Sequence, residues 1–243
     1  MGSQRSRCSR ELLESIERNL DALETREGLL DAALALSAYV DPDLDLDGTR
    51  ETLTSWTERI RERSGSNETR AVIARAHQVL FDELDLRGDT EDYYAPENSL
   101  LPSVVDRRRG LPITLSLVYK LVVEPLGSEA GSSEGSNSPR VEGLGAPGHF
   151  MVRVQGDSGF RAMIVDPFHG GRVRSDDEAR QMVRTVVGDE IADQVELLPV
   201  VSNRAWLGRI VRNLVGACRD RGIQDCERGL SELLELLEPD RSE

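Results

Sequence analysis

Residues 111–123, LPITLSLVYKLVV, limit the fold more than any other stretch, because a helix formed by them is apolar on nearly every side. A helix of that kind has to be buried all round. Pro112 suits the first turn of such a helix, where its missing N–H costs nothing. We therefore expect a central buried helix, and a chain of 243 residues is long enough to cover it.

The segment before this helix has the apolar periodicity of amphipathic helices. Leucine, isoleucine and alanine recur at helical spacing through residues 10–88, which predicts a helical N-terminal region. The turn-forming stretch 41–48 predicts a connecting loop, with further helices near 49–63 and 68–85. The polar residues 1–9 are expected to be a flexible tail.

The rest of the chain divides into a core and a helical end. Residues 89–200 mix turn formers, the buried helix and strand-like runs, and are the predicted core. Within them the Gly/Ser-rich segment 127–140 predicts a flexible surface loop. Residues 201–243 have the periodicity of a helical hairpin, with helices at about 203–220 and 224–237.

Two strands are expected in HFMVRV and FRAMIVDPF, joined by the turn-like QGDSG. A four-residue loop over 156–159 would pair Gln155 with Phe160 and put His149 directly opposite Asp166. A loop of three or five residues would put these two side chains on opposite faces. We predict the even loop, and hence a histidine and an aspartate on one face.

A histidine facing an aspartate is the arrangement of a general base and the group that orients it. Both residues also have a structural interpretation, because Asp-Pro commonly forms a turn. A charge-assisted hydrogen bond between His149 and Asp166 could simply tie the sheet together. Of the other histidines, His169 is expected to be an exposed turn residue, and His77 lies on a helix with no evident partner.

Three long motifs carry a family resemblance. The run YYAPENSLLPSVVDRRRGLPITLSLVY, then PGHFMVRV and IVDPFHGGR, closely resembles the SirB-type transglutaminase-like family over roughly residues 20–235. The resemblance implies an α+β fold: a papain/transglutaminase-like core with a central helix on a small antiparallel sheet, and helical N- and C-terminal regions. It also implies that residues 201–243 are a truncated tetratricopeptide-like tail of about one repeat.

Active transglutaminase-type enzymes use Cys, His and Asp, and the resemblance gives the second and third roles to His149 and Asp166. The first position departs from the pattern, because Gly-Leu-Pro at 110–112 stands where such enzymes have Gly-x-Cys. No cysteine lies between Cys8 and Cys218. Classical thiol chemistry is therefore not expected, and SirB-type relatives share this proline-bearing pattern.

Hydroxyl groups and water are the remaining candidate nucleophiles. Thr114 and Ser116 lie in the first turns of the buried helix, where they could act beside a base. Equally, they could pack or bond to backbone, as such residues usually do near helix starts. The further candidates for the groove are Arg107, Arg108, Arg109, Tyr94, Asn98 and Phe168. The three arginines could bind an anionic group or pair internally with carboxylates.

The charge balance limits the partners. The net charge of −14 argues against nucleic acid and anionic membranes as partners. Lys120 is the only lysine, and an acidic chain with almost no lysine resembles the proteins of salt-adapted organisms. No apolar run has the length of a membrane span, and the polar start of the chain is unlike a secretory signal, so we expect a cytoplasmic protein. Cys218 and Cys226 are expected to be reduced packing thiols. No metal or organic cofactor is expected, because the sequence contains no evident ligand cluster.

Three functions are compatible with these residues. The one we favour is a pseudoenzyme that binds an unidentified protein or peptide partner in the former active-site groove, with a binding or regulatory role. The second is a hydrolase or acyl-transferase that uses His149 and Asp166, with water or Thr114/Ser116 as the attacking group. The third is a structural module that acts through its terminal helices.

Overall fold

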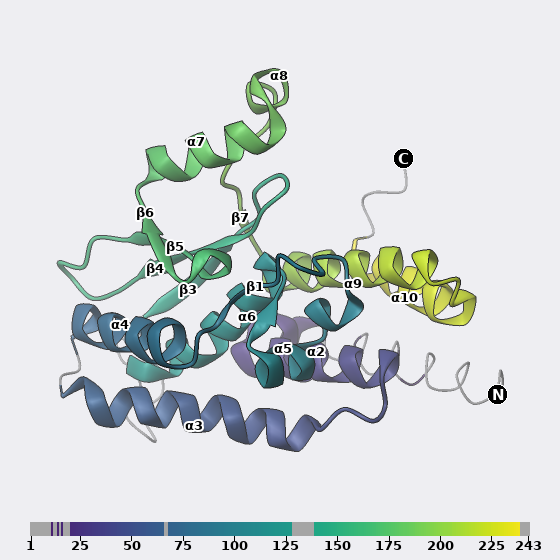
Figure 1. Ribbon diagram of the computed structural model, residues 1–243, viewed down its shortest axis with the longest axis horizontal. Helices are drawn as coiled ribbons and strands as arrows, with labels where there is room; N and C mark the ends of the chain where they lie inside the picture. The colour runs from purple at the N-terminus through teal and green to yellow at the C-terminus, as the bar shows by residue number, and fades with distance from the viewer. Residues whose placement is uncertain are drawn as a thin grey trace.

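The computed structural model describes residues Glu11, Glu14, Ile16, 20–65, 68–127 and 139–238 (Figure 1). The α-helices within these residues are α2 (Arg26–Val40), α3 (Leu46–Ser64), α4 (Thr69–His77), α5 (Leu101–Arg107), α6 (Pro112–Val123), α7 (Asp176–Val187), α8 (Asp189–Ala192), α9 (Asn203–Asp220) and α10 (Gln224–Leu237). The short 3₁₀ and π segments are η1 (Asp21–Glu24), η2 (Gln78–Glu83), η3 (Pro96–Ser99), η4 (Glu124–Gly127) and η5 (Pro167–His169). The strands are β1 (Arg87–Gly88), β2 (Arg109–Gly110), β3 (Arg140–Leu144), β4 (Met151–Gln155), β5 (Met163–Asp166), β6 (Arg172–Arg174) and β7 (Val200–Val201).

Helix α6 is at the centre of the molecule, and each of its residues is buried. It packs against α3, α5 and α9 and against the strands β3 and β4, which confirms the predicted buried helix. Its single charged residue, Lys120, donates hydrogen bonds to Glu124 Oε1 (2.6 Å) and to the Val141 carbonyl (2.8 Å). The ammonium group is thereby paired, as a buried charge has to be, and it ties the end of α6 to β3.

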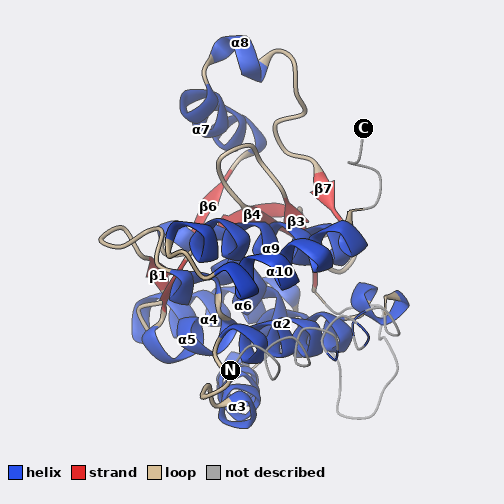
Figure 2. Cartoon of the chain, turned by 90° about the vertical axis from the view of Figure 1, so that its right-hand side faces the viewer, coloured by secondary structure: helices blue, strands red, loops and turns tan. Residues whose placement is uncertain are grey.

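The large sheet is antiparallel, with the strand order β6-β5-β4-β3-β7, and helices cover both of its faces (Figure 2). Successive residues of β4 and β5 point to opposite faces of the sheet and belong to two separate hydrophobic cores. One face packs on α6 through Val152, Val154 and Val165. The other packs on α7 through Met151 and Ile164. This central helix on an antiparallel sheet is the α+β architecture that the sequence predicts.

The predicted register between β4 and β5 is wrong by two residues. It would pair Val152 with Met163, whereas Val152 pairs with Val165, so the loop begins after Gln155 and extends beyond Phe160. A shift of two residues leaves every side chain on its predicted face. His149 and Asp166 therefore share a face, although they are not directly opposite each other in the ladder.

Three strands of the sheet are not predicted from the sequence. β3 begins at Arg140, the last residue of the segment predicted as a flexible loop, of which residues 128–138 lie outside the described residues. The predicted tail at 1–9 lies outside them too. β6 has three residues and β7 two, too few for an alternating pattern to be visible.

The helices α9 and α10 form the predicted hairpin over the predicted residues. Fully buried Trp206 anchors α9, since its Nε1 donates to the Ile113 carbonyl at the start of α6 (3.1 Å). The prediction of two reduced thiols is wrong for this pair of helices. Cys218 and Cys226 form a disulfide across the hairpin, with a Cα–Cα distance of 6.2 Å. Helical periodicity predicts that both residues face inward but not that they face each other.

The N-terminal helices α2, α3 and α4 cover the face of α6 that lies away from the sheet (Figure 1). His77, at the end of α4, has a partner that the sequence does not reveal: its Nε2 lies 3.0 Å from the hydroxyl of buried Tyr119. None of the helices in the described residues combines the length and the hydropathy needed to cross a membrane.

Stability should depend on pH through His77. Burial, partly opposed by Asp82, lowers the pKa of His77 from 6.5 to about 4. The unfolded chain therefore binds this proton at a higher pH than the native protein, and stability falls as the pH drops from 6.5 to 4. We expect the share from this ring to be about 3 kcal/mol, the equivalent of that pKa difference. Urea denaturation across this window should give a flatter pH dependence for His77→Gln, which keeps a hydrogen-bonding group and cannot titrate. Parallel curves for the two proteins would contradict the assignment.

Candidate functional site

His149 enters the site from a turn that precedes β4. The His149 N–H donates to the Ala146 carbonyl (3.3 Å), and Gly148 between them has φ +70°. A Cβ on Gly148 would also lie 2.8 Å from Val186 of α7, so both backbone and packing favour glycine here. This turn directs the His149 ring to Asp166 at the end of β5, where Nε2 lies 3.0 Å from Oδ1.

The carboxylate of Asp166 is completely buried, and five nitrogen atoms surround it. Its Oδ1 accepts from His149 Nε2 and, at 3.4 Å, from the backbone N–H of His169. Its Oδ2 accepts from His169 Nδ1 at 2.8 Å and from Nε and Nη2 of Arg174 at 3.0 and 2.9 Å. A buried carboxylate needs this many partners to remain charged.

Burial alone would raise the pKa of Asp166, but the hydrogen bonds and charges of His149 and His169 lower it below its ordinary value. Asp166 is therefore an ionised acceptor, and Nε2 of His149 donates to it. In the neutral imidazole the proton then lies on Nε2, and Nδ1 keeps its lone pair. Nδ1 has no hydrogen-bond partner among the described residues.

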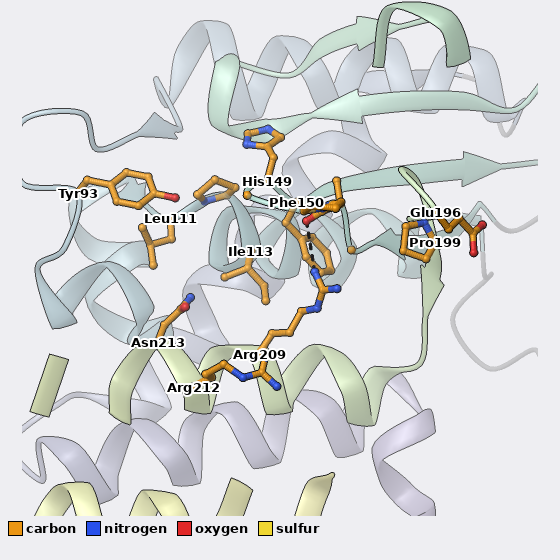
Figure 3. A pocket seen from close by; sticks show the side chains of 15 residues that line it. Tyr93, Leu111, Ile113, His149, Phe150, Glu196, Pro199, Arg209, Arg212 and Asn213 are labelled. Atoms are coloured by element: carbon orange, nitrogen blue, oxygen red, sulfur yellow. Dashed lines mark hydrogen bonds between the residues drawn. The ribbon is translucent and has the colours of Figure 1, made fainter. Parts of the chain in front are cut away.

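A pocket of about 490 Å³ adjoins His149 (Figure 3). We call it the His149 pocket; it is lined by Tyr93, 111–113, 145–150, Glu196, Pro199, Arg209, Arg212 and Asn213. His149 reaches it from the sheet, whereas Arg209, Arg212 and Asn213 reach it from α9 on the opposite side. Its volume is in the range of small-ligand sites.

The beginning of α6 contributes only apolar side chains to this pocket, namely Leu111, Pro112 and Ile113. The candidate hydroxyl residues Thr114 and Ser116 are fully buried and do not line it. Neither Thr114 Oγ1 nor Ser116 Oγ has a hydrogen-bond partner among the described residues, His149 included. The structure therefore brings together the proposed base and the residue that orients it, but not these hydroxyls.

The site thus combines a histidine just before β4 with an aspartate at the end of β5, beside the N-terminal end of the buried helix α6. The model of the transglutaminase-like superfamily matches residues 48–212, more than half of the chain. The chain belongs to the transglutaminase-like superfamily. The match includes the sheet, the central helix and the first half of α9.

Several curated relatives have the same type of sequence. A UPF0162 protein of Xylella fastidiosa is 32% identical over 190 residues, which cover 76% of this chain and 63% of the relative. The F-box only protein 21 of Mus musculus is 29% identical over 171 residues, covering 68% of this chain and 25% of that protein. A UPF0162 protein of Vibrio cholerae is 24% identical over 164 residues, or 65% and 53% of the two chains. The chain thus spans less than two thirds of the length of these relatives. No solved structure matches it significantly.

Of the other predicted groove residues in this transglutaminase-like chain, Phe168 is near the His–Asp pair, with its ring 5.9 Å from that of His149. Tyr94 is 84% exposed, and its ring contacts that of Tyr93, which lines the His149 pocket. Asn98 is buried and structural: its amide nitrogen donates to the Asp92 carbonyl (2.7 Å) and its oxygen accepts from Arg107 (2.7 Å).

The three consecutive arginines do not line the His149 pocket. Arg109 pairs with Asp85 (2.7 Å), and Arg107 lies 3.6 Å from Asp89 in addition to its bond with Asn98. Arg108 is exposed and ends α5 with φ +58°. For Arg107 and Arg109 the contacts match internal pairing, the alternative to anion binding.

Sequence reasoning missed two partners of Asp166. His169 has a half-exposed side chain, as expected for a turn, yet it binds the carboxylate. Arg174 is missed because its strand is missed. The ladder pairs Asp166 with Arg172 and Ile164 with Arg174, which makes Arg174 a diagonal neighbour of Asp166 on the same face. The three residues of that strand, Arg-Val-Arg after Gly-Gly, are too few to mark it in the sequence.

The expectation that the chain has no ligand cluster needs correction. His149, Asp166 and His169 can each offer a ligand atom, all within 4.8 Å of one another. These are residue types that bind transition metals. The guanidinium of Arg174 already holds Asp166 Oδ2 through two N–H groups, and its positive charge opposes a cation at that position. The donor set thus fits a resident metal poorly.

Loss of the Asp166 charge should destabilise the protein. Asp166→Asn leaves the guanidinium of Arg174, whose side chain is 9% exposed, without its carboxylate. We expect a loss of about 3–5 kcal/mol at pH 7, the usual cost of breaking a buried pair. Because the native pKa is below the unfolded value of 3.8, the stabilisation is present above that pH and disappears as the pH falls towards the native pKa.

Chemical denaturation of wild type and Asp166→Asn from pH 7 downward tests this. The difference between the two proteins should be largest at neutral pH and should shrink below pH 3.8. The double variant Asp166→Asn/Arg174→Gln, in which no charge is left unpaired at this position, should recover part of the lost stability. A constant difference at all pH values would exclude an ionised Asp166 as the cause.

Proposed function

We propose that this transglutaminase-like chain binds a protein or peptide segment in the His149 pocket and carries out no thiol chemistry. One observation carries the proposal: where a nucleophile would enter the pocket, α6 presents the hydrocarbon side chains of residues 111–113. The His–Asp pair and an open pocket nevertheless remain. A site with recognition groups but no attacking group suits binding.

The composition of the pocket supports a peptide ligand. Its apolar floor comes from α6 and Phe150, while Tyr93, His149 and Asn213 supply polar groups at its edge. Burial raises the pKa of Tyr93, so its hydroxyl remains protonated and can donate. Apolar walls with a few fixed polar groups are typical of small-ligand pockets, and one or two residues of a peptide are ligands of that size.

The narrower family assignment is also part of this proposal. The motifs quoted above favour the SirB-type subfamily, and the antiparallel helices α9 and α10 are compatible with a single tetratricopeptide-like repeat. A cytoplasmic location is also proposed, and the net charge of −14 argues against nucleic acid and anionic membranes as partners. We infer a regulatory role from the combination of a retained pocket and a missing nucleophile.

The tautomer of His149 favours a second function, that of a hydrolase. With Nε2 donating to Asp166, Nδ1 could take a proton from a water molecule in the pocket. The water oxygen would then attack an acyl carbon, and the proton would pass to the leaving group. This hydrolase needs no side-chain nucleophile, whereas Thr114 and Ser116 would first have to leave the core.

The third alternative, a module that works through its terminal helices alone, has less support. α9 carries fully buried Trp206 and three residues of the His149 pocket, so it belongs to the same site. Deletion of residues 201–243 would therefore disrupt the core. Substitutions on the exposed face of α10 are the appropriate probe of that alternative.

An array of soluble peptides, followed by fluorescence anisotropy of those that bind, tests the proposal. His149→Ala should weaken binding roughly tenfold, because it removes a buried hydrogen-bonding ring from the pocket. Arg219→Gln, on α9 but outside the pocket, should bind as wild type does. Equal affinities for wild type and His149→Ala would contradict binding in this pocket.

The same peptides distinguish binding from hydrolysis. Mass spectrometry after prolonged incubation with wild type should show intact peptide only. Cleavage by wild type that is absent with folded His149→Ala would favour the hydrolase instead.

A further inference from the structure

We propose that a groove between α3 and α5, which we call the Trp56 groove, binds a basic peptide segment of a partner protein. The indole N–H of Trp56 donates to a backbone carbonyl of that segment. The groove has a volume of about 510 Å³ and shares no residue with the His149 pocket, so its ligand is independent of the function proposed above. α3 and α5 lie side by side and both pack on α6, which fixes the two walls (Figure 1).

The central feature of the groove is Trp56 on α3. The residue is only 6% exposed, yet its Nε1 has no hydrogen-bond partner within the described ranges. Unlike Thr114 Oγ1 and Ser116 Oγ, this nitrogen is not fully enclosed, so its N–H opens onto the groove that Trp56 lines. The N–H of a nearly buried indole usually has an acceptor. A carbonyl of a bound segment would supply the missing one.

The second tryptophan shows the usual arrangement. Trp206 is fully buried, and its Nε1 donates to the Ile113 carbonyl at 3.1 Å. The chain contains two tryptophans. One indole N–H is therefore satisfied inside the protein, and the other depends on solvent or a ligand. Trp206 is thus an internal control for any measurement on Trp56.

The acidic residues of the groove select a cation. Asp43, from the loop before α3, and Asp106, on α5, both line it. Neither carboxylate has an ion-pair or hydrogen-bond partner in the part of the chain that the structure describes. Asp45 lines the groove too, but it caps α3, since its Oδ1 accepts from the Gly48 N–H at 2.9 Å. Two carboxylates are thus left for a ligand.

The remaining charged residues of the groove do not cancel these two. Glu97 lies 3.6 Å from Arg221, and Arg107 is paired as described above. Arg108 is exposed at the end of α5, and its guanidinium has no partner among the residues described. Two unmatched carboxylates and one unmatched guanidinium, on a protein with a net charge of −14, favour a cationic ligand.

An arginine or lysine residue within a peptide meets both requirements of the groove. Its side chain is the cation, its backbone carbonyl is the acceptor for Trp56, and its aliphatic stem can lie on Leu44, Pro102 and Val105. A polyamine has cations but no acceptor. Phosphate groups and nucleic acids bring negative charge, which Asp43 and Asp106 repel. A basic peptide segment is therefore the ligand that fits.

Titration of the ¹⁵N-tryptophan-labelled full chain with acetyl-Gly-Arg-Ala-Arg-Gly-amide tests the inference, beside a matched peptide with citrulline at both arginine positions. The arginine peptide should shift the indole ¹H–¹⁵N signal of Trp56 and leave that of Trp206, the signals being assigned through Trp56→Phe. It should bind roughly tenfold more tightly than the neutral peptide at low salt, and the ratio should fall as salt is added. Equal affinities, or an unshifted Trp56 signal, would overturn the inference.

Calorimetry on variants separates the two recognition elements. Trp56→Phe keeps an aromatic ring but removes the donor, and should weaken binding of the arginine peptide roughly fivefold. Asp106→Asn should weaken it roughly threefold. Arg108→Asn should tighten it roughly twofold, because a repelling charge is removed and asparagine tolerates the φ of +58° at this position.

Glu232→Gln is the matched control, since it removes one negative charge from the exposed face of α10, outside the groove. It should bind the arginine peptide as wild type does. Equal weakening by Glu232→Gln and Asp106→Asn would mean that only the overall charge of the protein attracts the peptide. Unchanged binding by folded Trp56→Phe would contradict the role of the indole N–H.

Discussion

The complete burial of α6 is the constraint on which the rest of the structure depends. A helix whose residues are all inside the protein needs apolar partners in every direction. The N-terminal helices supply them on one side, the sheet on another and α9 on a third. Because these layers meet at the beginning of α6, side chains from distant parts of the chain come together there. The His149 pocket is the space between them.

The second constraint is the buried carboxylate of Asp166. It holds His149, His169 and Arg174 together at the ends of adjacent strands, and their hydrogen bonds and charges in turn keep it ionised. In this superfamily the arrangement resembles a base with its orienting group. Here it faces Leu111, Pro112 and Ile113, which cannot attack a substrate. The same geometry that would activate a nucleophile can therefore serve to recognise a ligand.

Much of this fold could be predicted from the sequence, and the reasons are physical. α6 is marked by a continuous apolar run with a proline at its start, and α9 and α10 by helical periodicity; their bounds agree with the structure. The shared face of His149 and Asp166 followed from parity alone, so it survived an error of two residues in register. Periodicity does not reveal contacts between elements. Arg174 depends on the pairing of a three-residue strand, and Arg209 on the docking of α9 against α6, so neither could be predicted.

Ionised Asp166 fixes the proton of His149 on Nε2 and leaves Nδ1 unprotonated. The tautomer of His149 tests it most directly, by long-range ¹H–¹⁵N correlation spectra of protein with ¹⁵N-labelled histidine. The chain has only three histidines, and substitution of each in turn assigns their signals. At a pH where the ring is neutral, His149 should show a protonated Nε2 and an unprotonated Nδ1. A proton on Nδ1, or fast averaging between the two nitrogens, would contradict the account.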